Sequence, residues 1–556
     1  MPKIKIPTNK QFRGQYEGEF FGNIYASQNI DLESNKGKVR LGEKYSDIID
    51  SADDAQLTTP IAFVRTAADG TDRWWALATG SALFKTTNTD PETGWTQDAI
   101  ASSPTAALYD MIEFAGALLV STATDIDRLS TTWDTDWWSD QAVAVAMQAK
   151  PHRFALFSGS VLITDGRFIN TWDGTTAEDP GLTLPSQFDA QFIIPTADYV
   201  HIGTKSLSGA EAEVFVWDRV SVAYNARYGI GDSECLAGFA VAGIPYMITK
   251  KGEIKRFTGQ GYATVQQFPT VELSQTITDI HPNGVVVDEN IVRILVNFGT
   301  ITDLRKLSGI WTFDASTNNL YHSGSVVNDA GKDASQLELS AVGAIVATLP
   351  TQGKYLVGAK SYKVYTGTTI SGIFTSDETS TASQVGWFMT PKISSQDVHR
   401  YVQEVFIRFK NFLNSTDRVR LFYRTKESTT LSPDYETATW VSTTTFTGTN
   451  SDVAVGDIAL AIAGDNAGKI VEITAITAGS PNTYTFTPAV SASTNAFRVR
   501  YMNLKNLGTA QTQGVDFMHF PVDKSAGWIQ MLVELRGGIT SPEVEELLVS
   551  IVEEQF

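Results

Sequence analysis

Residues 152–174 read HRFALFSGSVLITDGRFINTWDG. This stretch contains three short apolar runs rich in β-branched and aromatic residues, and the turn signals Ser158-Gly159 and Asp165-Gly166 separate them. Apolar runs of this length between Gly, Asp or Asn turns are typical of β-hairpins. The stretch therefore predicts three antiparallel strands joined by two tight turns and ending at Trp172-Asp173-Gly174.

Related stretches recur on both sides of this one. The clearest lie at 111–129, 239–259 and 344–367, and weaker ones at 74–85, 199–218 and 291–314. A step of about 40 to 50 residues is the period of a four-stranded propeller blade. A plain series of hairpins in a β-sandwich is the alternative, but sandwich strands show turn signals without a fixed period. We therefore expect a β-propeller of six or seven blades.

The pattern changes after the polar stretch 376–383. Beyond it, strands that alternate apolar and polar residues are expected at 402–409, 419–424, 528–535 and 544–552, as in a β-sandwich. Between them, 441–497 carries further strand signals and reads as a small inserted β-unit. The sequence thus predicts an all-β chain: an N-terminal extended arm (1–55), a β-propeller (56–380) and a C-terminal β-sandwich (381–556) with the inserted unit at about 441–497.

Charge and composition exclude several classes of protein. The 556 residues carry a formal net charge of -19, which argues against generic nucleic-acid binding because phosphate contacts need clustered Lys and Arg. The sequence contains no run of the roughly 18 to 20 apolar residues that spans a bilayer, so we expect no membrane insertion. The first ten residues do not resemble a secretory signal, which predicts synthesis in the cytoplasm. A single cysteine, Cys235, rules out an internal disulfide framework.

Residues that could carry chemistry are scattered. The six histidines (152, 201, 281, 322, 399 and 519) stand alone without metal-ligand spacing. The glycine-bearing stretch Tyr228–Ser233 lacks the following helix that a phosphate site needs. Thr89–Trp95 resembles an Asp-box turn only faintly, and its spacing is wrong for one. We therefore expect no catalytic, cofactor-binding or metal-binding residues, and we expect that the chain is not an enzyme.

Three tryptophans, Trp133, Trp137 and Trp138, lie close together among acidic residues. If these side chains are exposed, they could stack on sugar rings or anchor a protein interface. If they are buried, they would pack at the edge of a blade. Packing or an interface is the favoured interpretation.

Several stretches resemble a known class of protein. Residues 199–204, 214–219 and 248–259 look like the blades of tail nozzle and tail-hub proteins of short-tailed bacteriophages. Residues 29–41 resemble the starts of such virion proteins, and 540–547 resemble their C-terminal sandwich. The resemblance implies a structural virion protein of a phage tail, in a ring that is usually sixfold, through which DNA leaves.

The resemblance also implies partners. They are further copies of the chain in a homo-oligomeric ring, with a hexamer favoured, together with portal-adaptor proteins and tail fibre or spike proteins. DNA would pass through the lumen without specific binding, and the protein would be found in the virion. Two other functions stay open: a receptor- or glycan-binding propeller of a phage tail and, less favoured, a glycoside hydrolase.

Overall fold

A computed structural model represents the protein. It describes residues 3–6, 24–28, 30–32, 39–42, 44–47, 59–78, 82–86, 91, 94–98, 108–140, 147–269, 277–299, 307–327, 335–336, 339–347, 355–361, 371–377, 385–394, 400–410, 417–425, 435–463, 466, 468–510, 514–537 and 541–553. Within these residues, no helix is long and apolar enough to cross a membrane.

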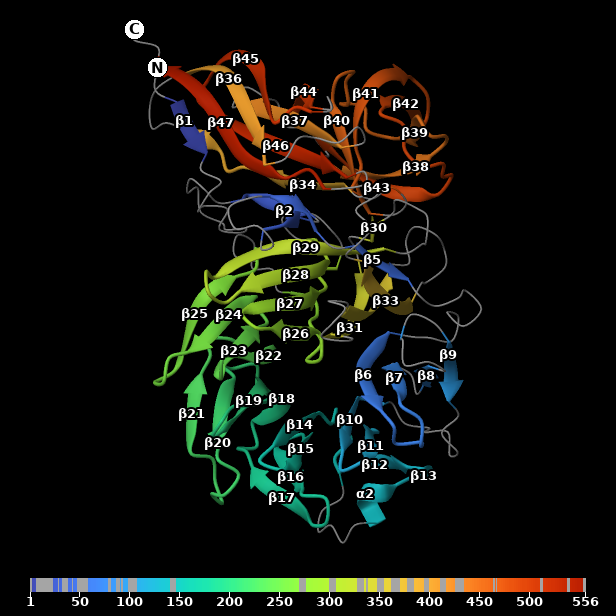
Figure 1. The fold of residues 1–556 in the computed structure, drawn as a ribbon, viewed down its shortest axis with the longest axis vertical. Helices are drawn as coiled ribbons and strands as arrows, with labels where there is room; N and C mark the ends of the chain where they lie inside the picture. The colour runs from blue at the N-terminus through green and yellow to red at the C-terminus, as the bar shows by residue number, and fades with distance from the viewer. Residues whose placement is uncertain are drawn as a thin grey trace.

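The chain folds as the expected all-β structure, with a β-propeller below a β-sandwich in the view of Figure 1. Blade 1 contains β6 (Pro60–Thr66), β7 (Arg73–Ala78), β8 (Ala82–Thr86) and β9 (Trp95–Asp98), and blade 2 contains β10 (Asp110–Phe114), β11 (Ala117–Ser121), β12 (Ile126–Ser130) and β13 (Thr132–Asp134), followed by helix α2 (Trp137–Asp140). Blade 3 contains β14 (Phe154–Phe157), β15 (Ser160–Asp165), β16 (Phe168–Trp172) and β17 (Ala177–Thr183). Blade 4 contains β18 (Phe188–Pro195), β19 (Val200–Ser206), β20 (Glu213–Trp217) and β21 (Ala226–Gly229).

Three further blades complete the propeller. Blade 5 contains β22 (Cys235–Val241), β23 (Ile244–Thr249), β24 (Glu253–Phe257) and β25 (Tyr262–Gln267). Blade 6 contains β26 (Val285–Asp288), β27 (Ile291–Val296), β28 (Gly309–Asp314) and β29 (Asn319–Val327), with β30 (Ser335–Gln336) beside β29. Blade 7 contains β31 (Leu339–Ala347), β32 (Tyr355–Ser361), β33 (Ser371–Asp377) and β5 (Lys44–Asp47). The first strands of successive blades contact one another around the ring, and β31 contacts β6, so the described residues form seven blades.

The stretch that decided the fold class forms β14, β15 and β16 in blade 3. Ser158 and Gly159 both have positive φ, 49° and 75°, as a tight two-residue hairpin turn requires. The side chains of Val161, Leu162 and Ile163 are fully buried. These strands thus pair as the apolar runs and turns predict.

Two sheets form the sandwich. One contains β1 (Lys3–Ile6), β47 (Val544–Glu553), β36 (Arg400–Phe409) and β45 (Phe517–Ala526), and the other contains β2 (Ala26–Gln28), β34 (Val385–Met389), β46 (Trp528–Arg536), β37 (Arg418–Thr425) and β44 (Lys505–Ala510), with β35 (Ile393–Ser394) on β46. Inward-facing residues of both sheets share one core. The sheet of β36, β45 and β47 follows the expected apolar-in, polar-out alternation, whereas β34, β46 and β37 of the other sheet are buried on both faces.

The inserted unit is a closed barrel. Its strands run β38 (Tyr435–Trp440), β39 (Thr445–Gly448), β42 (Asn482–Thr487), β41 (Ile470–Thr477), β40 (Ile458–Ala463) and β43 (Ala496–Met502) around the ring. Its strands span residues 435–502, beyond the expected 441–497 at both ends, because its first and last strands close the barrel by pairing Tyr435 with Arg500. Trp440 and Phe446 lie in its core.

The N-terminal segment differs most from the expectation of an extended arm at 1–55. Strand β1 extends one sandwich sheet and β2 the other, whereas β3 (Ile30–Asp31) and β4 (Arg40–Leu41) pair with each other. Strand β5 lies between β29 of blade 6, to which it is parallel, and β33 of blade 7. Strands of two to four residues are too short to show a period in sequence, so the sequence predicted an extended arm rather than strands that join both units.

Candidate functional site

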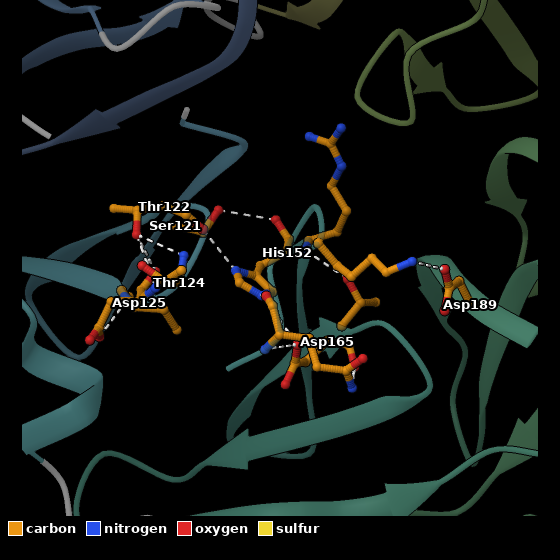
Figure 2. Close-up of polar contacts among 12 residues, drawn as sticks. Ser121, Thr122, Thr124, Asp125, His152, Asp165 and Asp189 are labelled. Carbon is orange, nitrogen blue, oxygen red and sulfur yellow. Dashed lines mark hydrogen bonds and ion pairs between the residues drawn. The ribbon is translucent and has the colours of Figure 1, made fainter. Parts of the chain in front are cut away.

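Polar contacts join neighbouring blades at one end of the propeller. His152, which precedes β14 in blade 3, is fully buried. Its Nδ1 lies 2.8 Å from the Thr122 carbonyl oxygen of blade 2, and its Nε2 lies 3.1 Å from the Gln148 carbonyl oxygen and 3.3 Å from Asp165 Oδ1. Figure 2 shows the imidazole between Thr122 and Asp165. The histidine thus links two blades through its ring.

Ser121, His152 and Asp165 have the residue types of a nucleophilic triad, but their arrangement differs from one. The Ser121 hydroxyl donates to the backbone carbonyl of His152, 3.0 Å away, rather than to the imidazole. A triad needs the serine on one ring nitrogen and the carboxylate on the other. Here a main-chain carbonyl lies beside Nδ1, so this group holds the blades together and does not activate Ser121.

Lysines and acids connect the following blades at the same end. Lys150 Nζ lies 2.8 Å from Asp189 Oδ2 in blade 4, and Lys205 Nζ lies 3.2 Å from Glu234 Oε1 at the start of blade 5. Both lysines are part-exposed, so each pair contributes at most about 1 kcal/mol. These contacts therefore add only weakly to the packing of one blade on the next.

Asn283 joins blades that lie on different sides of the propeller axis. It precedes β26 of blade 6, and its Nδ2 donates to the Ile61 carbonyl of blade 1 at 3.0 Å and to Asp110 Oδ1 of blade 2 at 2.7 Å. Its own carbonyl accepts from the Ile345 amide of blade 7. Since blade 2 stands three blades from blade 6 around the ring, these bonds cross the centre.

Replacing Asn283 with alanine is expected to destabilise the propeller by about 1–3 kcal/mol. The change removes the side-chain donor that the buried Asp110 carboxylate and the Ile61 carbonyl share. Asp110 keeps the amides of Met111 and Phe154, so the expected cost is that of lost buried hydrogen bonds rather than of a bare carboxylate. The urea midpoint of unfolding measures the loss. Asn225, which binds Asp218 within one exposed turn, is the control position. An Asn225→Ala change of equal effect would contradict the role of Asn283.

The group around Asn283 includes three charged side chains. Burial raises the pKa of Asp110 and of Asp279 and lowers the pKa of Arg153. The Arg153 guanidinium donates to the Tyr109 carbonyl and is attracted by both carboxylates. Asp110 also accepts from the Phe154 amide at 2.9 Å. These partners are all internal, so the cluster holds blades 2, 3 and 6 at fixed positions.

The other sequence candidates lie at separate places in the fold. In the stretch Tyr228–Ser233, the Gly231 amide donates to the Glu211 carboxylate at 2.6 Å, which would repel a phosphate. His201 and His322 are buried in the propeller. A hydrogen bond joins His201 Nδ1 to the Tyr262 hydroxyl oxygen, 2.8 Å away. His281 is buried, His519 is exposed and His399 lies outside the described residues. Within the described residues, no group of three or more His, Cys, Asp or Glu side chains could hold a metal ion.

The tryptophan cluster packs between blades. Trp137 and Trp138 are buried in α2, and the Trp137 ring meets Trp172 of blade 3 edge to face with 4.7 Å between centroids. Trp133 is half-buried against Trp75 of blade 1, and its Nε1 donates to Asp98 Oδ2 at 3.3 Å. The packing interpretation is therefore confirmed for Trp137 and Trp138.

The stretch Thr89–Trp95 is described only in part, since residues 89–90 and 92–93 lie outside the described residues. Within it, Trp95 is buried and its ring nitrogen donates to the Pro91 carbonyl.

A second site joins the propeller, sandwich and barrel. One buried apolar cluster contains Leu307 from blade 6, Trp387 and Phe422 from the sandwich, and Ile458 and Ile470 from the barrel. Gln28 of β2 is also buried there and accepts from Trp387 Nε1 at 2.7 Å. The three units are therefore packed against one another.

Buried charges complete this junction. Glu534 of β46 accepts from the guanidiniums of Arg420 and Arg536, and both arginines also donate to the Ile470 carbonyl of the barrel. Burial opposes ionisation of Glu534, but the two arginines outweigh it and lower its pKa. Glu534 and Arg420 were not expected as site residues, although each is a charge within an apolar run.

No family model and no curated protein matches this chain. Similar solved structures include the computationally designed Ika8 protein (13% identity, 60% of this chain and 99% of that one, TM-score 0.38) and YCF48 bound to D1 peptide (11%, 57% and 93%, 0.39). Raptor from Chaetomium thermophilum is another (10%, 61% and 29%, 0.39). These likenesses concern the fold alone.

Proposed function

We propose that this chain is a structural protein of a bacteriophage tail, where copies form a nozzle or hub ring around the path of the leaving DNA. The observation that carries the proposal is the junction: a buried apolar cluster and a buried charge network join propeller, sandwich and barrel. A subunit of a closed ring must present two different faces at a fixed angle, and a rigid multi-part body meets that need.

The electrostatics of the chain also support the proposal. With a net charge of -19, a ring of copies would repel a polyanion and let it slide without binding. Because the contacts of Asn283 cross the propeller axis, the DNA path that we propose runs between subunits rather than through the propeller. The ring order, with six copies favoured, the contacts with portal-adaptor and fibre or spike proteins, and the virion location belong to the same proposal.

Mass measurement of the purified protein tests the proposal. Light scattering followed by negative-stain class averages should show a ring of about six copies with an open centre. A chain that stays a monomer would instead favour the receptor- or glycan-binding propeller. Turnover of a chromogenic glycoside would contradict both and favour a glycoside hydrolase.

A further inference from the structure

One side of the barrel carries a surface without charge. It consists of outward-facing residues at one end of four adjacent strands, and we call it the threonine face: Thr439, Val441, Thr445, Thr447, Thr474, Ala475, Thr477, Thr483 and Thr485. Figure 1 shows β39, β41 and β42 at the outer edge of the barrel, away from the propeller. The opposite strand, β40, is covered because Ile458 and Leu460 lie in the junction cluster.

Strand register places these residues in rows. Thr439 pairs with Thr447, Thr447 with Thr483, and Thr483 with Thr477, so four threonines lie side by side across four strands. Thr445 and Thr485 begin a second row that ends at Ala475. Cross-strand neighbours on one face lie about 4.5–5.5 Å apart. The face is therefore a continuous layer of methyl and hydroxyl groups.

The absence of charge stands out in this chain. Charged residues are 19% of the sequence, yet the nine positions hold none. On β41 the face ends at Glu472, an outward-facing residue between Val471 and Ile473 of the barrel core. Loss of charged residues is the compositional mark of the core of a protein interface. Threonine has few side-chain rotamers, so little entropy is lost when such a face is covered. The face has the composition of a contact surface.

Charge also indicates what covers it. Two copies of a chain with net charge -19 repel each other, and they can touch most easily where neither places a carboxylate. The barrel is closed and leaves no free strand edge for pairing, so the contact must be made by side chains. We infer that the threonine face packs against a second copy of this chain and forms the core of the contact between ring neighbours. This inference rests on the proposed function.

Added negative charge tests the inference. Thr439 and Thr477 are exposed at the two ends of one row, so the double change Thr439→Glu and Thr477→Glu leaves the barrel core intact. We expect this variant to require at least tenfold more protein to form the ring, measured by light scattering over a dilution series. The control, Val222→Glu with Ala223→Glu, adds the same charge at an exposed turn of blade 4 and should assemble like the unmodified chain. Thermal melting checks that both variants fold.

The outcomes separate the two proposals. A ring that persists in the Thr439/Thr477 variant overturns the threonine-face contact and leaves the tail ring in place. Equal weakening by both variants assigns the loss to total charge and overturns the contact as well. An unmodified chain that never forms a ring overturns both proposals. Binding of neutral host polysaccharide that only the Thr439/Thr477 variant loses, with the ring intact, would assign the face to a glycan instead.

Discussion

Replacing Glu534 with glutamine is expected to destabilise the sandwich and the barrel by about 3–5 kcal/mol. The change leaves the buried Arg420 guanidinium without its counter-ion, and removal of one partner of a buried ion pair costs this much. Arg536 loses the same partner. Because both arginines also hold the Ile470 carbonyl of the barrel, loosening should appear at the barrel as well as in the sandwich.

A glutamate on the neighbouring sheet provides the matched control. Glu546 lies 4.0 Å from Arg408, an exposed arginine, and a surface pair of this kind contributes at most about 1 kcal/mol. Urea unfolding of Glu534→Gln and Glu546→Gln measures the difference, and hydrogen exchange of barrel amides locates it. Equal losses in the two variants would show that the Glu534 network does not hold the barrel.

Acid is expected to destabilise the propeller through its buried histidines. Burial lowers the pKa of His201 to about 4 and that of His322 to about 4. An unfolded chain binds protons at these residues below about pH 6.5, whereas the folded chain does so only near pH 4. Stability from each histidine is therefore full above about pH 6.5 and is lost as the pH falls toward 4, by about 3 kcal/mol per histidine.

The double variant His201→Gln and His322→Gln tests this pH dependence. Glutamine keeps a hydrogen-bonding group near the Tyr262 hydroxyl and the Ser308 carbonyl but cannot titrate in this range. We expect a smaller fall in the urea midpoint between about pH 7 and pH 5 than in the unmodified chain. His519→Gln, at an exposed position, is the control and should leave the pH dependence unchanged. An unchanged slope in the double variant would assign the acid sensitivity to other groups.

Regular elements were predictable because their signal is local. In β14 to β16, apolar runs and turn residues follow one another within a few positions, and the strands pair in that order. The alternation in β36 likewise predicts a half-buried strand, whereas the similar alternation in β46 did not reveal that both of its faces are buried. The function of the chain has no such local signal, since it depends on surfaces that meet other molecules.

The contacts that join the units could not be read from the sequence. Tyr45 of β5 packs in one cluster with Ile310 of blade 6 and Val357 of blade 7, more than 260 residues away along the chain. Asn283 lies in a loop whose residue types do not reveal that Ile61 and Asp110 face it. Nothing in a strand of four residues predicts its partner, because main-chain hydrogen bonds are the same for every sequence.

By itself, the sequence determined the all-β class, the repeated blade unit and the change to a sandwich, because hydrophobic period and turn chemistry act between neighbouring residues. Only the tertiary structure decided the seventh blade, which β5 completes, the barrel limits at 435–502, and the junction at Glu534. These features depend on which distant residues share a buried space. Burial lowers the pKa of His201 and His322, whereas the two arginines beside Glu534 lower its pKa against the effect of burial. These shifts have no counterpart in the linear order of residues.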